Sequence, residues 1–341
     1  MGCYNCGMVT DAKAAKRIKR SVILAVAALV LTGCVSVHFQ APSDAGNVQE
    51  SSDGGKAQDD PHIKEASKGK GSKDPEKTDG ASDAYNPGVV STERIYLDPD
   101  WEWADMAVID TGFSVLYKAA HNRKNEVVAV NAGHGTKGGD TKRVYCHPDR
   151  SPKITNGSNP AGSLTAIAIS LGMTFRDGSF ESDAALATAR LLRDKLLDKG
   201  YDVLMIRDSR NVMLDNVART VIANNMAKCL VSIHFDDDGF KYDKGCFYVP
   251  TPDEIKGMEP VASVWREHDK LGNALLDGLS GRGCTIYKGN IIPQELTQTC
   301  YSKIPAVVIE LGNTNSKHDD EALTKLAGGL CDGVEKYMEG L

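Results

Sequence analysis

The stretch Glu126-Val-Val-Ala-Val-Asn-Ala-Gly-His-Gly-Thr136 is the most informative part of this sequence. Its apolar, β-branched run is typical of a buried strand, and the run stops at His134, which has glycine on both sides. We therefore expect this strand to carry the His134 imidazole to the carboxyl edge of a sheet. The flanking glycines allow a sharp turn and leave room for a ligand. A Gly-His-Gly triplet also occurs where histidine caps or packs a tight turn, so the role of His134 depends on residues further along.

Length and charge narrow the class of protein. A chain of 341 residues, of which 41% are hydrophobic, can bury a substantial core. The formal net charge is −6, and no Lys/Arg cluster is interleaved with aromatic residues in the folded part. We therefore expect no nucleic-acid partner. The sequence indicates no oligomeric state.

The N-terminal region has the pattern of an export signal. Residues 13–20 are basic, residues 21–31 are apolar, and the run closes on Leu31-Thr-Gly-Cys34. The apolar run is too short for a transmembrane helix. Its ending resembles a bacterial lipoprotein signal, in which cleavage before Cys34 is followed by acylation of that cysteine. We expect residues 1–33 to be this signal and the protein to be extracytoplasmic and lipid-anchored to the cell membrane; an ordinary signal cleaved near residue 33 and an uncleaved anchor are the alternatives.

A polar segment separates this signal from the folded part. Residues 40–84 contain no aromatic residue and no Leu, so they cannot bury enough apolar surface to offset the entropy of ordering. We expect residues 34–84 to be a disordered tether, whose typical reach is roughly 40 Å for about fifty residues. Residues 85–125 are predicted to be an extended lead-in that packs on the catalytic domain of residues 126–341.

Apolar runs alternate with amphipathic segments through the rest of the chain. The expected strands after the first are 201–206, 229–235, 246–249 and 306–311, and the expected helices are 180–199, 214–222, 264–279 and 319–337. This alternation predicts a single α/β domain with a mostly parallel twisted sheet and helices on both faces. Ligands of such sheets bind at the carboxyl ends of the strands. The long segment 136–179, rich in Gly, Ser, Asn and Pro, is expected to form part of a site wall.

Four ionisable residues stand where such a site would form. His134 and His234 lie at strand ends, Glu181 opens a helix on its core-facing stripe, and Glu310 lies near the end of an apolar strand. A carboxylate that points to the core must be paired or bound to metal, although a solvated Glu favoured by the helix dipole is a common alternative. Two imidazoles and one carboxylate with an open fourth position make a catalytic zinc site, and a further carboxylate can serve as proton shuttle.

Six features in order support a named resemblance. They are the strand into Gly133-His134-Gly135, the helix-opening Glu181, Ile206-Arg207-Asp208, the Leu214, Arg219 and Ala223-Asn224 pattern, Ser232-Ile233-His234, and Pro305-Ala-Val-Val-Ile-Glu-Leu-Gly312. From about residue 127 to 341 the chain resembles the zinc-dependent N-acetylmuramoyl-L-alanine amidases that hydrolyse bacterial cell wall.

The resemblance implies Zn²⁺ bound by His134, Glu181 and His234, with Glu310 catalytic and peptidoglycan as the substrate. Asp177 and Asp183 lie close to Glu181 in the sequence and are the alternatives for the third ligand. The chain departs from the family pattern at three places, which are Asn131-Ala132, Asp236-Asp237-Asp238 and Asn313.

Two other functions fit the same residues. One is a lipid-anchored module that binds wall without cutting it, and the other is a zinc peptidase that acts on stem peptides. Because a non-catalytic relative could lose Glu310 or a ligand freely, the intact quartet favours an enzyme that cleaves the amide between N-acetylmuramic acid and L-alanine.

The remaining polar residues and cysteines are assigned structural roles. We expect Arg207, Arg219 and Asn224 to make a helix-end ion pair and turn hydrogen bonds, and His147 and His318 to lie at the surface. An exported protein can form disulfides. Any bridge is expected among four cysteines in loops or short strands, whereas the other two are expected to be buried thiols. The first group is Cys146, Cys246, Cys284 and Cys300, and the second is Cys229 and Cys331.

Overall fold

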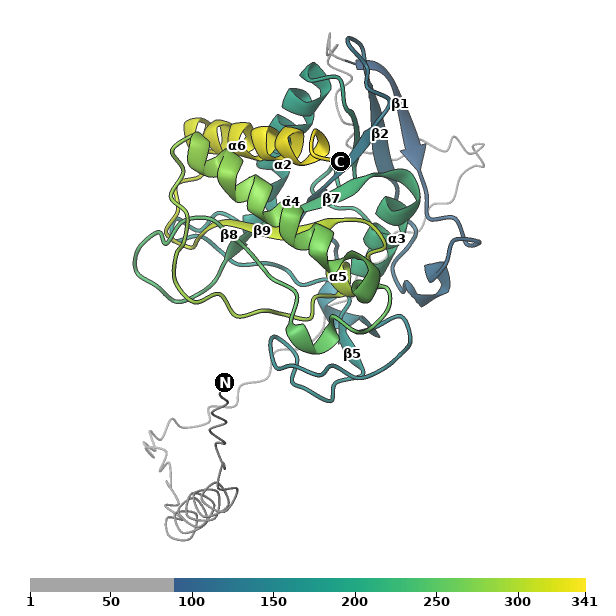
Figure 1. The fold of residues 1–341 in the computed structure, drawn as a ribbon. Coiled ribbons are helices and arrows are strands. Elements are labelled where there is room, and N and C mark those ends of the chain that lie inside the picture. The colour runs from purple at the N-terminus through teal and green to yellow at the C-terminus, as the bar shows by residue number, and fades with distance from the viewer. Residues whose placement is uncertain (1–88) are drawn as a thin grey trace, which may run out of the picture. The chain divides into compact units, whose positions relative to one another are not determined.

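A computed structural model of the chain describes residues 89–341 (Figure 1). The predicted signal, Cys34 and the predicted tether lie outside the described residues. A seven-stranded sheet runs in the order β1-β2-β6-β3-β7-β9-β8. Its strands are β1 (Val89–Ile95), β2 (Ser114–Ala119), β3 (Val127–Ala132), β6 (Asp202–Met205), β7 (Cys229–Asp236), β8 (Phe247–Tyr248) and β9 (Ala306–Asn313).

The centre of the sheet is parallel and its edges are antiparallel. Strands β6, β3, β7 and β9 pair in parallel, whereas β1, β2 and β8 join antiparallel at the two sides. The predicted single α/β domain with a mostly parallel sheet is thus confirmed. Residues 89–119, expected as an extended lead-in, contribute β1 and β2 to this sheet.

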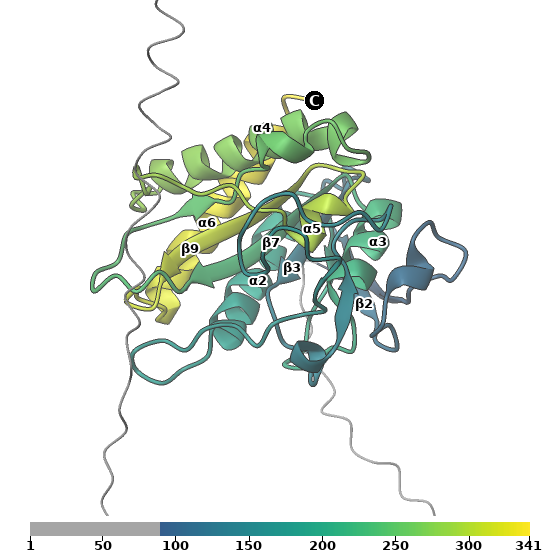
Figure 2. The same ribbon diagram turned by 90° about the horizontal axis from the view of Figure 1, so that it is seen from below.

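Helices cover both faces of the sheet (Figures 1 and 2). On one face lie α2 (Glu181–Asp198), α4 (Val261–Gly281) and α6 (Asp320–Met338), and on the other lie α3 (Asn216–Met226) and the short α5 (Thr297–Cys300). The helix predicted from the amphipathic pattern at residues 180–199 corresponds to α2. Its buried stripe includes Ala185, Ala189, Leu192 and Leu196.

Helices α4 and α6 lie against one another with very little space between their backbones. A Cβ atom added at Gly333 of α6 would lie 2.5 Å from the Cα of Leu275 on α4, and one at Gly278 would collide with the backbone at Gly329. Since real Cβ contacts are never this short, glycine at these positions allows the close packing of the two helices.

Alternation along the strands determines which side chains meet at the carboxyl edge. In β9, Ile309 and Leu311 pack in the core beneath α2, α4 and α6. Glu310 therefore projects from the opposite face. His234 on β7 is the register partner of Glu310, and in-register residues of neighbouring strands project from the same face. The fold thus places these two side chains side by side, at the sheet edge where His134 follows β3.

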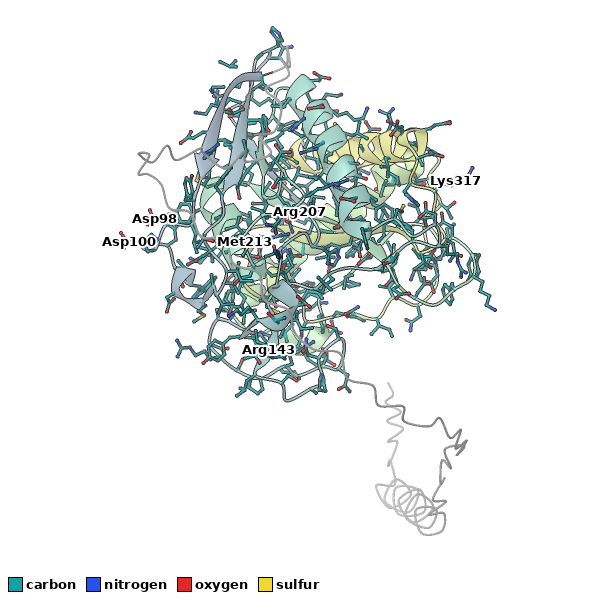
Figure 3. All side chains as sticks on the ribbon, turned by 180° about the vertical axis from the view of Figure 1, so that it is seen from behind. Asp98, Asp100, Arg143, Arg207, Met213 and Lys317 are labelled. Atoms are coloured by element: carbon teal, nitrogen blue, oxygen red, sulfur yellow. The ribbon has the colours of Figure 1, made fainter. Side chains whose placement is uncertain are left out.

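The long segment after His134 contains its own small sheet. Strands β4 (Arg143–Tyr145) and β5 (Thr165–Ile167) pair antiparallel in a two-stranded sheet. Figure 3 shows Arg143 of β4 toward the edge of the domain and Arg207, which is fully buried, near the centre of the view. Within residues 89–341, no helix has both the length and the apolar character needed to span a membrane.

The expectation that His147 lies at the surface is wrong. Its side chain is buried, and its Nε2 lies 2.8 Å from Glu295 Oε2, whose carboxylate also accepts the Ile154 amide at 2.9 Å. His147 and Glu295 lie 148 residues apart in the sequence. This buried contact ties the 136–179 segment to the chain that leads into α5.

Candidate metal centre and active site

His134 reaches the carboxyl edge in a conformation that few residues adopt. Its φ of 63° lies in the left-handed region, which is uncommon outside glycine and concentrates at functional sites. Its Nδ1 lies 2.9 Å from the carbonyl oxygen of Ser170. Because a carbonyl can only accept, Nδ1 carries the hydrogen, and in the neutral ring the Nε2 lone pair is free.

Glu181 is held by backbone amides as well as by the histidines. The Met173 amide donates to Oε2 at 2.8 Å, and the Phe235 amide donates to Oε1 at 3.1 Å. Glu181 is also the first residue of α2, where the helix dipole favours a negative charge. The carboxylate is therefore buried with a fixed orientation.

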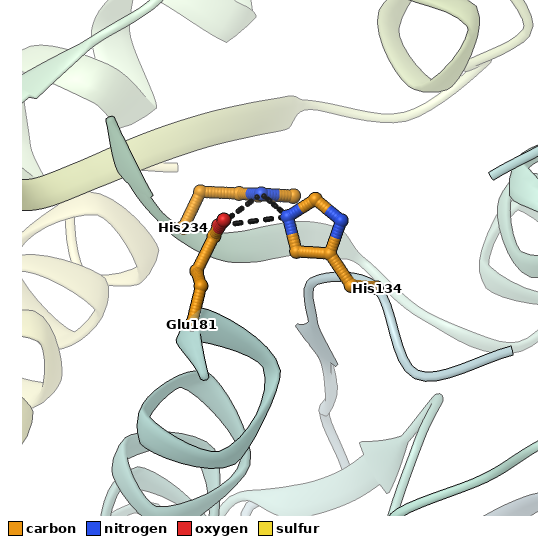
Figure 4. Close-up of side chains that lie close together, drawn as sticks. All are labelled: His134, Glu181 and His234. Carbon is orange, nitrogen blue, oxygen red and sulfur yellow. Dashed lines mark hydrogen bonds and ion pairs between the residues drawn. The ribbon is translucent and has the colours of Figure 1, made fainter. Parts of the chain in front are cut away.

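Three atoms from distant parts of the sequence converge at one point (Figure 4). His134 Nε2 lies 2.7 Å from Glu181 Oε1, and His234 Nδ1 lies 3.0 Å from both atoms. Within the described part of the chain, this trio is the one cluster of at least three His, Cys, Asp or Glu residues whose ligand atoms lie within 4.8 Å of one another. These are nitrogen and oxygen donors of the kind that zinc prefers.

The ionisation of the cluster suits a cation. Burial alone would raise the pKa of Glu181, but its hydrogen bonds with His134 and His234 outweigh burial and hold that pKa far below its usual range. Burial lowers the pKa of His234, although its contact with Glu181 opposes this shift. At neutral pH the cluster thus contains an ionised carboxylate and a neutral imidazole of His234.

Two buried arginines hold the backbone on either side of His134. Arg207 donates from Nη2 to the carbonyl of Gly133 at 2.8 Å, and Arg219 donates from Nη2 to the carbonyl of His134 at 2.7 Å. Both guanidinium groups also donate to the carbonyl of Ala132, at 3.1 Å. These two residues therefore make the expected turn hydrogen bonds, which position the His134 turn, and not the expected helix-end ion pair. Asn224 does make turn hydrogen bonds, to the backbone at Tyr301 and Lys303.

Because Gly133 and Gly172 have no side chain, there is room beside them for the side chains of the cluster. A Cβ atom at Gly133 would lie 2.7 Å from both ring nitrogens of His234. At Gly172, whose φ is 88°, a Cβ would lie 2.8 Å from His134 Cδ2 and 2.9 Å from Glu181 Oε2. Each of these side-chain positions therefore requires a glycine beside it.

Glu310 stands next to the cluster with one oxygen unused. Its Oε2 is buried and accepts no hydrogen bond from any group of residues 89–341. Burial raises the pKa of Glu310 well above its usual range, and the charges of Glu181 and Asp236 raise it further. A buried carboxylate oxygen without a partner is costly, so its presence beside three converging ligand atoms indicates a chemical role.

The alternatives for the third carboxylate lie elsewhere. Asp177 accepts from Ser179 and contacts His318 at 3.1 Å, and Asp183 faces Arg210 at 3.4 Å. The structure brings neither of them to His134 and His234.

In this structure the six cysteines of the described residues are thiols, and Cys229 and Cys331 are buried as expected.

Some groups that orient the site could not be predicted from the sequence, because they belong to the backbone. The carbonyl of Ser170 and the amides of Met173 and Phe235 orient the cluster, yet a backbone group leaves no trace in residue type. The only sequence signal is position: Ser170 and Met173 flank Gly172 in the segment expected to form a site wall.

Comparison with known proteins agrees with this geometry. Residues 128–329 match the family model described as N-acetylmuramoyl-L-alanine amidase. The fold is similar to that of the N-acetylmuramyl-L-alanine amidase Ami1 of Mycobacterium smegmatis, with a TM-score of 0.52, 18% identity, and coverage of 64% of this chain and 98% of that chain. It is also similar to the apo form of Ami1 of Mycobacterium abscessus, with a TM-score of 0.50, 22% identity, and coverage of 63% and 99%. No curated protein sequence matches the chain.

The family match covers more than half of the chain, and it includes all four predicted site residues. The chain therefore belongs to the N-acetylmuramoyl-L-alanine amidase family and is an enzyme that hydrolyses the amide bond between N-acetylmuramic acid and L-alanine in peptidoglycan.

Proposed function

We propose that His134, Glu181 and His234 hold a zinc ion and that Glu310 moves the proton during hydrolysis of the muramyl amide. The convergence of His134 Nε2, Glu181 Oε1 and His234 Nδ1 within 3.0 Å carries this proposal. The carbonyl of Ser170 holds the hydrogen of the neutral His134 ring on Nδ1, so in that form Nε2 faces the Glu181 carboxylate with a lone pair. Such a pair repels unless a proton or a metal ion lies between the two atoms, so the donor set fits zinc.

An amide is a poor electrophile with a poor leaving group, so its hydrolysis requires activation of the carbonyl and protonation of the departing nitrogen. When bound, zinc supplies a Lewis acid that polarises a carbonyl oxygen and lowers the pKa of water. Glu310, with its free oxygen, accepts the proton of the attacking water and returns it to the departing L-alanine nitrogen. Arg207 and Arg219 take no part in proton transfer; they hold the turn that carries His134.

Burial suits Glu310 to this role. A general base works best when its pKa lies near the operating pH, and an ordinary exposed glutamate is too acidic for that. Loss of solvation at Glu310 shifts its pKa upward, toward the range where the same carboxyl can both take and give a proton.

We also propose that the enzyme works outside the cytoplasm on a lipid anchor at Cys34. The support is the sequence: a basic stretch, a short apolar run, the Leu31-Thr-Gly-Cys34 ending and the polar residues 34–84. An acylated Cys34 would keep the catalytic domain near the membrane surface. The polar segment would let it reach peptidoglycan beyond the bilayer.

Mass spectrometry of digested peptidoglycan tests the reaction. The purified enzyme is expected to release free stem peptides that begin at L-alanine, together with glycan strands that lack peptide. Fragments cut within the stem peptide would instead identify a zinc peptidase. The Glu310→Gln variant, incubated in parallel, is expected to release neither product at a comparable rate.

A further inference from the structure

We propose that the loop of residues 236–244, the rim loop, binds the glycan strand of peptidoglycan, and that the exposed ring of Tyr242 is the surface on which a sugar ring stacks. The inference rests on the amidase activity assigned above. It goes further by naming the residue that contacts the sugar side of the scissile bond.

The rim loop presents a flat apolar surface to solvent. Tyr242 is 60% exposed. Its ring stacks on that of Phe240, with centroids 5.2 Å apart and planes only 7° from parallel. Contiguous exposed apolar surfaces that are rimmed by polar residues often mark a binding site. Phe240 fixes the orientation of the Tyr242 ring and leaves its surface available.

A buried lysine holds the ends of the rim loop together. The Lys244 side chain is only 7% exposed, and its ammonium contacts Asp236 at 2.6 Å and Asp238 at 2.9 Å. The same ammonium lies over the ring of Phe247 at 4.3 Å. Charge-assisted hydrogen bonds of this kind are stronger than neutral ones, so the loop has a defined shape.

The backbone beneath both aromatic rings is tied to the chain that follows β9. Buried Asn313 donates from Nδ2 to the carbonyl of Tyr242 at 2.9 Å and to Asp238 at 3.1 Å. Asn315 donates from Nδ2 to the carbonyl of Phe240 at 2.8 Å. Two of the three places at which the sequence departs from the family pattern thus support the rim loop, through Asp236, Asp238 and Asn313.

These contacts place the rim loop close to the scissile bond. Asn313 follows Glu310 by three residues on β9, a separation of about 10 Å along a strand. Phe247, which the Lys244 ammonium covers, is the register partner of Glu310. Asp236 ends the strand that carries His234. A sugar whose lactyl amide lies between Glu310 and the metal ligands is therefore within reach of Tyr242.

The flat ring favours the sugar over the peptide as its ligand. One face of a pyranose presents several C–H groups in a plane, which cover an aromatic ring well. On the other side of the scissile amide, the first residue is L-alanine, whose single methyl group covers little of a ring. Hydroxyl and acetamido groups of the sugar also suit the polar rim, where Asp237 and Lys241 are exposed.

The test is the affinity of the full-length chain for purified glycan strands without stem peptides, which offer no amide to cleave. Tyr242→Ala is expected to weaken this binding about 10-fold, and Tyr242→Trp, which retains a stacking surface, to stay within about 2-fold of the wild type. The matched control is Tyr96→Ala, because Tyr96 is 53% exposed and packs on Phe113, but follows β1 at the other side of the sheet.

Kinetics on intact peptidoglycan provide a second readout. Tyr242→Ala is expected to raise KM about 10-fold and to leave kcat within about 2-fold, since the ring contacts substrate away from the reacting atoms. Unchanged zinc content and thermal unfolding will show that the variant is folded.

Wild-type binding of bare glycan by Tyr242→Ala would overturn the proposal, as would an equal loss in Tyr242→Trp or in Tyr96→Ala. Competition by free stem peptide that depends on Tyr242 would assign the ring to the peptide instead. If the wild type binds bare glycan through Tyr242 but releases no stem peptide, the proposed zinc chemistry fails while the rim loop assignment stands.

Discussion

His234 and Glu310 are register partners on the neighbouring strands β7 and β9, and both side chains project from the same face of the sheet. A candidate metal ligand and a carboxylate with one buried, unpartnered oxygen are thereby adjacent without any loop having to bring them together. Sites built on strands hold their geometry better than sites built on loops. Because of this register pairing, His234 can bind the metal while Glu310 beside it transfers the proton.

Glu310→Gln separates these two roles. The substitution keeps the size of the side chain but removes its ability to take a proton. We expect zinc and wall binding to be retained while hydrolysis falls by about 10²–10⁴, the usual effect of losing an acid–base group. Metal analysis and release of stem peptides check this. Near-normal turnover would assign the proton transfer to another residue, and loss of zinc would make Glu310 a ligand.

Gly133→Ala tests whether the space beside His234 matters. The added methyl group would lie 2.7 Å from both ring nitrogens of His234 and would push the imidazole away. We expect zinc affinity to fall about 10- to 100-fold, as when an outer-sphere partner of a ligand is lost. Competition with a chelator measures this. Gly257→Ala is the control, because a Cβ there meets nothing within 4 Å; equal affinities in the two variants would contradict the geometry.

His268 on α4 is expected to make stability depend on pH. Its Nδ1 accepts the Ala306 amide at 2.9 Å, so its buried Nε2 carries the hydrogen, and Nε2 has no partner within residues 89–341. Burial lowers its pKa from 6.5 to about 4. The unfolded chain therefore binds a proton as the pH falls through 6.5, whereas the folded chain does so only near 4. The stabilisation is fully present above pH 6.5 and is lost as the pH falls to about 4.

The predicted loss at His268 is about 3 kcal/mol. His268→Asn keeps an acceptor for the Ala306 amide but does not titrate, so its free energy of unfolding should fall less over the same pH range. Urea unfolding above pH 6.5 and near pH 4 measures the difference. The control is His121→Asn at an exposed position, which should behave as the wild type. Parallel pH curves for wild type and His268→Asn would refute this assignment.

Cys34→Ala tests the anchor. Acylation requires the thiol, so the variant should leave the membrane fraction or accumulate as an uncleaved precursor. Fractionation and the mass of the N-terminal peptide decide this. One acyl chain binds a membrane only marginally, so stable anchoring implies more than one chain on the cysteine. A processed species of unchanged size that stays in the membrane fraction would exclude the lipoprotein hypothesis.

The parts of the fold that follow from local patterns could be predicted from the sequence. The apolar run before His134 corresponds to β3, and the 3.6-residue periodicity of residues 180–199 corresponds to α2. Glu181 was expected on the core-facing stripe of its helix, and the structure places it there. These patterns depend only on neighbours in sequence, which is why one sequence suffices to see them.

Long-range contacts account for what the sequence did not reveal. The pairing of β2 with β6 depends on hydrogen bonds between strands far apart in the chain, and β1 joins the sheet only through β2, so neither strand could be identified from its neighbours in sequence. His147 was assigned to the surface because nothing near it in sequence suggests a partner, whereas Glu295 lies 148 residues away. The roles of Arg207 and Arg219 depend on backbone carbonyls at the His134 turn, which carry no residue signature.

Metal analysis of the purified protein tests whether His134, Glu181 and His234 bind zinc. We expect one zinc ion per chain in the wild type, none in His134→Ala or His234→Ala, and weakened binding in Glu181→Ala, because each variant removes one of the three converging ligand atoms. His318→Ala, which removes an imidazole that contacts Asp177 instead, should keep its zinc. Full zinc occupancy and activity in either His134→Ala or His234→Ala would show that these histidines are not zinc ligands.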